Sequence, residues 1–94
     1  MTGQISEVHF PYALIEIEHD SSEGVQLYAV VQSESEDLTT GQTVEGVSME
    51  PDDIAEVEVD GQPDFHFRTI RSFRDEYKAG MCFQRMKQRF LSER

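Results

Sequence analysis

The sequence predicts a mainly β protein, in which a small barrel is followed by a C-terminal α-helix. Three observations lead to this prediction. Short segments alternate apolar and polar residues with a period of two, as strands with one buried face do. Clusters of turn-forming residues, among them Gly, Pro and Asp, separate these segments. Beyond about residue 68 the apolar period becomes helical, and this last part of the chain holds every lysine and arginine.

The strand pattern recurs along the first two thirds of the chain. Its clearest example has Ile15 and Ile17 on one face and Glu16 and Glu18 on the other, which is typical of a half-buried strand. The next segment, 25–31, is more continuously apolar, so we expect it to lie more centrally in the sheet. The expected strands span residues 4–9, 12–19, 25–31, 42–48, 54–60 and 65–67.

The connections between these strands are polar. A five-residue loop, 20–24, is expected to close a hairpin between the second and third strands. The polar segment after the third strand predicts a loop or a single helical turn anchored by Leu38. Gly46 interrupts an alternating segment and indicates a bulge or tight bend, and Asp60-Gly61 is a hairpin-turn signal. This order of elements fits a small Greek-key barrel of the OB type with a C-terminal helix.

We expect one domain, because 94 residues match the size of a single hydrophobic core. Residues 1–68 would form the OB-like barrel, and residues 69–94 a basic amphipathic helix packed on the barrel or on a partner. Thr69 or Ser72 is expected to cap this helix, which would run to about Ser92.

Two apolar stripes and a basic stripe run along this segment. A helix packed on a barrel needs one apolar face, so two faces indicate either a break at Gly80 or a second apolar surface for a partner. The first apolar stripe comprises Ile70, Phe73, Tyr77, Met81 and Leu91. We expect a partner to bind the second apolar stripe and the basic stripe, at Phe83, Met86, Phe90, Arg71, Arg74, Lys78, Arg85 and Arg89.

Charge is strongly polarised along the chain. Residues 1–67 carry sixteen carboxylates and no lysine or arginine, whereas residues 68–94 carry eight basic and three acidic residues, for a net charge of −11. This balance argues against nucleic acid and anionic membranes as partners. The basic stripe could pair with the chain's own barrel, at about 0–1 kcal/mol for each exposed pair, or dock on an acidic groove of another protein. The acidity also fits adaptation to high salt.

The sequence contains no recognisable catalytic or metal-binding motif. His9, His19 and His66 fall in different expected strands and lack the spacing of metal ligands. Carboxylate pairs on two strands are expected to face solvent. Cys82 is the single cysteine, which excludes an internal disulfide, and is expected to be half-buried on the helix. We therefore expect no catalysis by this chain, no metal and no cofactor. With no signal peptide or spanning segment visible, we expect a cytoplasmic protein.

A family resemblance covers roughly residues 3–68. A Pro-Tyr pair opens a strand that ends in acidic residues, a Gly-led strand follows, then an acidic segment with Leu, a Gly-x-x-Val strand start and a Phe-x-Phe-Arg closing strand. The residues concerned are Pro11, Tyr12, Gly24, Leu38, Gly41, Val44, Phe65, Phe67 and Arg68. In this order they resemble the OB-fold domain of the DUF35 family of acyl-CoA-associated accessory proteins. The paired-cysteine zinc ribbon usual in that family is missing, and the basic helix is additional.

The resemblance implies a non-catalytic accessory subunit that docks on a partner enzyme acting on acyl-CoA, of the thiolase, synthase or hydratase class. Association, with that enzyme or with a second copy, would then use residues 69–92. The alternative is an acidic protein-binding or inhibitor module that presents its carboxylate surface to a basic partner and so mimics nucleic acid. The surface that binds distinguishes these hypotheses.

Overall fold

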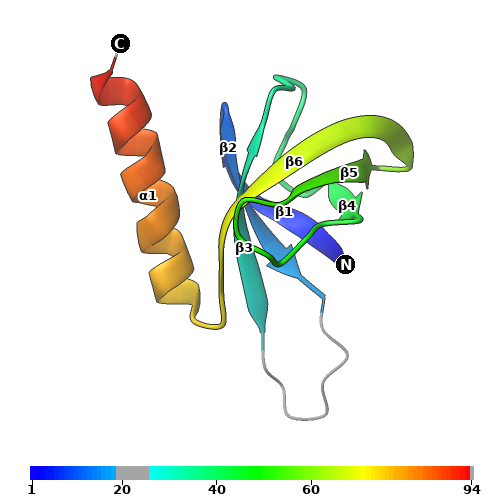
Figure 1. Cartoon of the computed structure of the whole chain (residues 1–94), viewed down its shortest axis with the longest axis horizontal. Helices are drawn as coiled ribbons and strands as arrows, with labels where there is room; N and C mark the ends of the chain where they lie inside the picture. Colours follow the sequence, from blue (N-terminus) through cyan, green and yellow to red (C-terminus); the bar gives the residue numbers. More distant parts are fainter. Residues whose placement is uncertain (19–25, 94) are drawn as a thin grey trace.

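The computed structural model describes residues 1–18 and 26–93. In these residues six strands form a closed antiparallel barrel, and one helix lies against its outer wall (Figure 1). The predicted fold class, a small OB-type barrel with a C-terminal helix, is confirmed. The elements are β1 (Thr2–His9), β2 (Tyr12–Ile17), β3 (Leu27–Ser33), β4 (Thr43–Glu45), β5 (Ile54–Val59), β6 (Gln62–Phe73) and α1 (Glu76–Ser92).

The barrel is built from two three-stranded meanders that close on each other. One meander is β1–β2–β3 and the other is β4–β5–β6. They are joined where β1 pairs with β4 and where β3 pairs with β6. The spatial order β4–β1–β2–β3 is that of a Greek key. The predicted five-residue hairpin loop, 20–24, lies outside the described residues.

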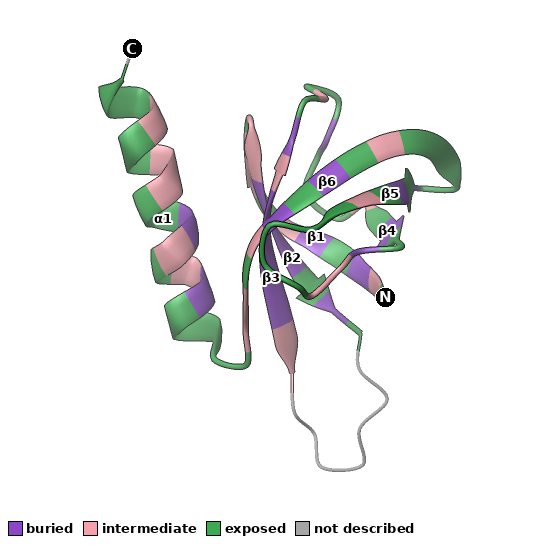
Figure 2. Ribbon diagram, in the orientation of Figure 1, coloured by how far each residue is buried: buried purple, intermediate pink, exposed green. Residues whose placement is uncertain are grey.

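Side chains from all six strands fill one core inside the barrel. Figure 2 marks buried positions along the strands in purple. On β2 the predicted alternation is confirmed, because Ile15 and Ile17 are fully buried while Glu16 and Glu18 are exposed. Leu38 anchors the loop after β3 in this core, as expected, and no helical turn forms there. The core thus holds together the barrel on which α1 rests.

Two turns follow their sequence signals closely. Gly46 has a φ of +98°, and a Cβ there would lie 2.8 Å from the backbone oxygen of Glu56. The bend after β4 therefore requires glycine. Asp60 and Gly61 have φ values of 51° and 80° and form the two-residue turn between β5 and β6, as their sequence predicts.

The predicted boundary between barrel and helix, at residues 68 and 69, is wrong. Thr69 lies inside β6 and is completely buried. Its N–H donates to the backbone oxygen of Asp53 at 2.9 Å, and its hydroxyl donates to that of Ser48 at 2.7 Å. Ser72 is also part of β6. The strand continues because these residues find partners in β3 and in the loop before β5, far away in sequence.

Asp75 caps the helix instead. Its carboxylate accepts a hydrogen bond from the backbone N–H of Tyr77 at 2.9 Å, which satisfies one of the free donors of the first turn. From there α1 runs without a break through Gly80 to Ser92, so the helix ends where the sequence predicts and the alternative of a break at Gly80 is wrong.

The helix packs on the outer face of β2, β3 and β6. There, Leu14, Tyr28 and Val30 form a second apolar cluster with Ala79 and Phe83 of α1. Strand β3 is therefore buried on both faces, by the core inside and by α1 outside. This double burial explains its continuous apolar sequence. In a closed barrel every strand has two neighbours, so β3 differs from the other strands by this outer cover and not by a more central position.

The second apolar stripe of the helical segment packs on the barrel and does not face a partner. Phe83 is only 1% exposed against the barrel, and Met86 packs against the same cluster. The Phe90 ring meets the rings of His9 and Tyr12 edge-on, at centroid distances of 6.4 and 6.3 Å. The expectation that Phe83, Met86 and Phe90 form a free partner-binding patch is thereby corrected. They attach α1 to its own barrel.

Candidate functional site

The solvent-facing side of α1 carries the large exposed apolar side chains of the helix. We call it the outer face, and define it by Tyr77, Met81, Gln84, Gln88 and Leu91. Tyr77 is 74% exposed, Leu91 44% and Met81 39%. Tyr77, Met81 and Leu91 belong to the first apolar stripe. Its other two members, Ile70 and Phe73, lie on β6 and pack beneath the helix.

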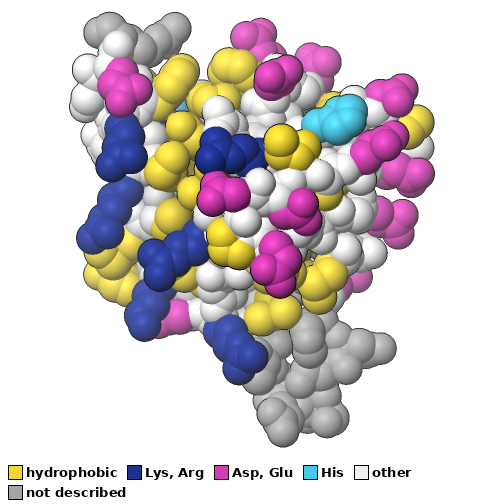
Figure 3. Space-filling model, viewed as in Figure 1, with side chains coloured by type: hydrophobic (Ala, Val, Ile, Leu, Met, Phe, Trp, Pro, Cys, Tyr) yellow, Lys and Arg dark blue, Asp and Glu magenta, His cyan; other side chains and the backbone are white. Residues whose placement is uncertain are grey.

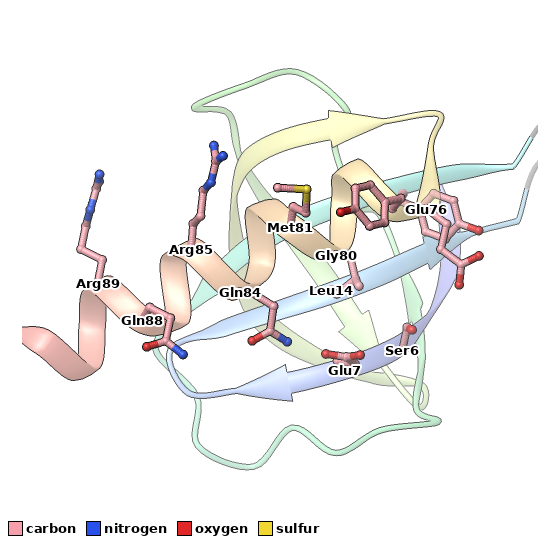
Figure 4. Close-up of a pocket in the computed structure, with 12 residues that line it drawn as sticks. Ser6, Glu7, Leu14, Glu76, Gly80, Met81, Gln84, Arg85, Gln88 and Arg89 are labelled. Atoms are coloured by element: carbon pink, nitrogen blue, oxygen red, sulfur yellow. The ribbon is translucent and has the colours of Figure 1, made fainter.

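A groove of about 740 Å³ follows one side of the outer face, between α1 and strands β1 and β2. Figure 4 shows Gln84 and Gln88 directed toward this side, with Glu7 on β1 opposite them. Leu14 supplies an apolar floor, and Gly80 leaves the helix backbone open to the groove. We call this the β1-side groove. Its polar walls and apolar floor suit an amphipathic occupant.

A second groove, of about 450 Å³, follows the opposite side of the outer face next to β6. We call it the β6-side groove. Phe73, Met81, Cys82 and Met86 provide apolar surface. No carboxylate is found among the described residues that line it. Four cations line it: Arg71, Lys78, Arg85 and Arg89. Arg85 and Arg89 also line the β1-side groove, and Figure 4 shows them directed to the side of α1 opposite Gln84 and Gln88.

These cations are not neutralised by the barrel. Within residues 1–18 and 26–93, the one ion pair joins Arg68 to Asp52 at 2.9 Å, away from α1. Arg71 lies with its guanidinium 5.5 Å from the centre of the Phe73 ring, a cation–π contact. Figure 3 shows most of the dark blue side chains along α1 and most of the magenta ones over the barrel. The basic stripe was expected either to pair with the chain's own barrel or to dock on an acidic groove of another protein. In the described residues it does not pair with the barrel.

The structure brings together most of the predicted basic residues and separates the aromatic ones from them. Arg74 is exposed in the turn before α1 and does not line the β6-side groove. Met86 contributes to that groove, whereas Phe83 and Phe90 do not. Gln84 and Gln88 were missed, because a search for apolar stripes passes over glutamine. Their spacing with Tyr77, Met81 and Leu91 is the signal that could have found them.

Among residues 1–18 and 26–93, other reactive groups do not assemble into a site. No cluster of three or more potential metal ligands occurs among the described residues. His66 is exposed on β6, and His9 lies under α1 beside Phe90. Cys82 is half-buried, as expected; burial raises the pKa of its thiol, although the charges of Arg71 and Arg85 act to lower it. The thiol is therefore poorly suited to act as a nucleophile.

Comparisons of the chain with models of protein families, with curated proteins and with solved structures found no match. In the described part of the chain, α1 is too short and too polar to cross a membrane.

Proposed function

We propose that this protein is a non-catalytic binding module, an accessory subunit that docks on an acidic surface of a partner protein through α1. The observation that carries the proposal is the β6-side groove, where exposed cations surround an apolar floor and have no carboxylate partner in the described chain. Arginine, methionine and aromatic side chains are enriched at interface cores. The outer face and the β6-side groove together offer all three kinds.

The charge distribution supports docking in one orientation. The acidic barrel would repel an acidic partner, whereas the cations along α1 attract it. Complementary potentials of this kind raise association rates and suppress wrong orientations. A partner with an acidic patch would therefore meet the protein helix first.

The resemblance to the DUF35 family supports a partner that acts on acyl-CoA, of the thiolase, synthase or hydratase class. In this proposal the partner supplies all catalytic groups. The chain supplies a surface, and it holds no metal or cofactor of its own.

The test is a quantitative capture experiment with the full-length tagged protein and the lysate of its native cells. A variant with Lys78→Gln, Arg85→Gln and Arg89→Gln removes three cations from α1. A matched control with Glu45→Gln, Glu56→Gln and Glu58→Gln removes three exposed carboxylates from the barrel. We expect mass spectrometry to identify a partner that the first variant no longer captures and the second variant still captures. The affinity is then measured with this protein and that partner, both purified. A partner retained equally by both variants would refute docking through α1.

A second candidate function is the acidic module that binds a basic partner. One observation favours it: Ile54, Glu56 and Glu58 form one exposed row on the outer face of β5, and Ile54 is 65% exposed. In the same capture experiment this function predicts the opposite pattern. A basic protein would be lost by the carboxylate variant, kept by the α1 variant and released at high salt.

A further inference from the structure

The outer face of α1 has the spacing of a coiled-coil seam. Its five residues follow one another at intervals of four, three, four and three residues, which is the alternation of the core positions in a heptad repeat. All five are exposed. Ala79 and Phe83, on the opposite side of the helix, hold it on the barrel. The helix thus presents one packing face to β2 and β3 and a second to solvent.

This second face is long enough for helix pairing but too polar to rely on apolar burial. From Tyr77 to Leu91 it extends about 21 Å, at roughly 1.5 Å per residue, or four turns. Two of its five positions are glutamine. Glutamine adds little to the hydrophobic term, so a helix that pairs here needs further attraction from the flanks of the seam.

Gly80 permits close approach on one flank. A Cβ at this position would meet no heavy atom of the described chain within 4 Å, so the fold itself does not require glycine. In a helix interior glycine is nevertheless about 1 kcal/mol less favourable than alanine. A glycine that the protein's own packing does not need, beside an open groove, is suited to a position where another backbone comes close.

The flanks of the seam are basic. Lys78 and Arg85 occupy one flank, with Arg89 beside them, and Lys87 occupies the other. In coiled coils these flanking positions determine which helices pair. Two antiparallel copies of α1 would place Lys78 and Arg85 of each copy against the same cations of the other. Two parallel copies would pair none of these cations with a carboxylate. The net charge of −11 on each chain adds further repulsion.

We propose that the docking element of the partner is an acidic amphipathic helix. It lies along the outer face of α1, fills the seam with apolar side chains and directs its carboxylates toward Lys78, Arg85 and Arg89. This inference rests on the proposed function and specifies the kind of partner that the same surface takes. Charge complementarity at the flanks selects an acidic helix over a second copy of the chain.

Three synthetic peptides test the inference against the full-length protein labelled with ¹⁵N. Two are three-heptad helices with leucine at both core positions and either glutamate or lysine at every flanking position; like charges keep each from pairing with itself. The third is an unstructured polyglutamate of the same charge as the first. Dissociation constants and amide shifts are measured by NMR titration. We expect the glutamate helix to bind at least about tenfold more tightly than the other two, with the shifts confined to α1 and both grooves.

Two variants and one control locate the contact. The double variant Lys78→Gln with Arg85→Gln should bind the glutamate helix about tenfold more weakly than the wild type. The double variant Tyr77→Ser with Met81→Ser should also bind it more weakly. The control variant with Glu45→Gln, Glu56→Gln and Glu58→Gln should bind the glutamate helix as well as the wild type does, or better. Equal binding of glutamate and lysine helices, equal binding of polyglutamate, or shifts on the barrel outside the two grooves would overturn the inference. If the glutamate helix does not bind as expected but capture of the native partner still requires Lys78, Arg85 and Arg89, this inference fails and the proposed function stands. If capture of the native partner does not depend on these cations, the proposed function fails.

Discussion

Replacing Gly80 by alanine should make the protein more stable. Gly80 lies within α1, four residues after its first residue Glu76, where alanine is favoured over glycine by about 1 kcal/mol. The added methyl group would meet no heavy atom of the described chain within 4 Å, so no clash offsets this gain. We therefore expect the free energy of unfolding to rise by about 1 kcal/mol, and the midpoint of thermal unfolding by about 4–8 °C for a domain of this size.

Urea denaturation followed by circular dichroism measures this change, provided that the m-value stays constant. The matched control is Gly3→Ala, because a Cβ on Gly3 would lie 2.6 Å from the backbone oxygen of Glu16 and 2.9 Å from Cγ2 of Ile15. That substitution should lower stability by about 1–3 kcal/mol. An unchanged or lower urea midpoint for Gly80→Ala would show that glycine has a role inside the fold, and would remove one support for a docking site.

The same substitution should weaken binding of the glutamate helix, since the methyl group points to the flank where the partner backbone approaches. Gains in stability at the expense of binding are common where a binding surface keeps a locally unfavourable residue. The NMR titration of Gly80→Ala against wild type gives this comparison directly. A variant that is more stable and binds equally well would mean that the partner stays away from Gly80.

Two further predictions use the same denaturation assay. Phe83→Ala should lower the free energy of unfolding by about 3–5 kcal/mol, because Phe83 is 1% exposed. Met81→Ala, on the outer face, should change it by less than about 1 kcal/mol. Similar losses from the two substitutions would contradict the assignment of the two helix faces. Burial, and secondarily the charge of nearby carboxylates led by Glu76, raises the pKa of Tyr28 above its usual 10.0, so the folded state keeps a proton that the unfolded state loses. The free energy of unfolding should therefore fall as the pH rises above 10. The Tyr28→Phe variant should lose less stability than the wild type between about pH 9 and pH 11. Equal losses in the two proteins would refute this expectation.

The strands and tight turns could be predicted from the sequence because their signals are local. The Ile15 and Ile17 face of β2, the Asp60-Gly61 turn and the Gly46 bend each depend on residues next to one another in the chain. The number of short strands and the terminal helix favoured a small Greek-key or OB-type barrel. For such elements, local preference and the final fold agree.

The start of α1 could not be predicted in the same way. Thr69 has the side chain of a good helix cap, but in the fold its hydroxyl reaches Ser48 and its N–H reaches Asp53. Both partners lie well over ten residues earlier, so the preference of this segment for a strand depends on pairing that the local sequence does not reveal. Tertiary contacts override a weak local signal here.

The sequence of α1 alone also could not predict which face of the helix meets the barrel. Its periodicity identifies two apolar faces but does not say which one meets the barrel. The deciding information lies in β2 and β3, where Leu14 and Val30 point outward and need a cover. Phe83 provides it, and the outer face is left to solvent. A continuous apolar run in a strand therefore predicts the position of a covering helix better than the helix sequence does.

The position of α1 also gives the separation of charge a physical meaning. If the cations of the last third of the chain served to stabilise the fold, they would lie near the carboxylates of the barrel. The helix instead rests on the apolar strip formed by Leu14, Tyr28 and Val30. Its cations therefore face outward, and in the described residues none of those on α1 forms an ion pair. Exposed pairs would have contributed little to stability in any case. The proposed docking on a partner that carries carboxylates would account for the arrangement of these cations.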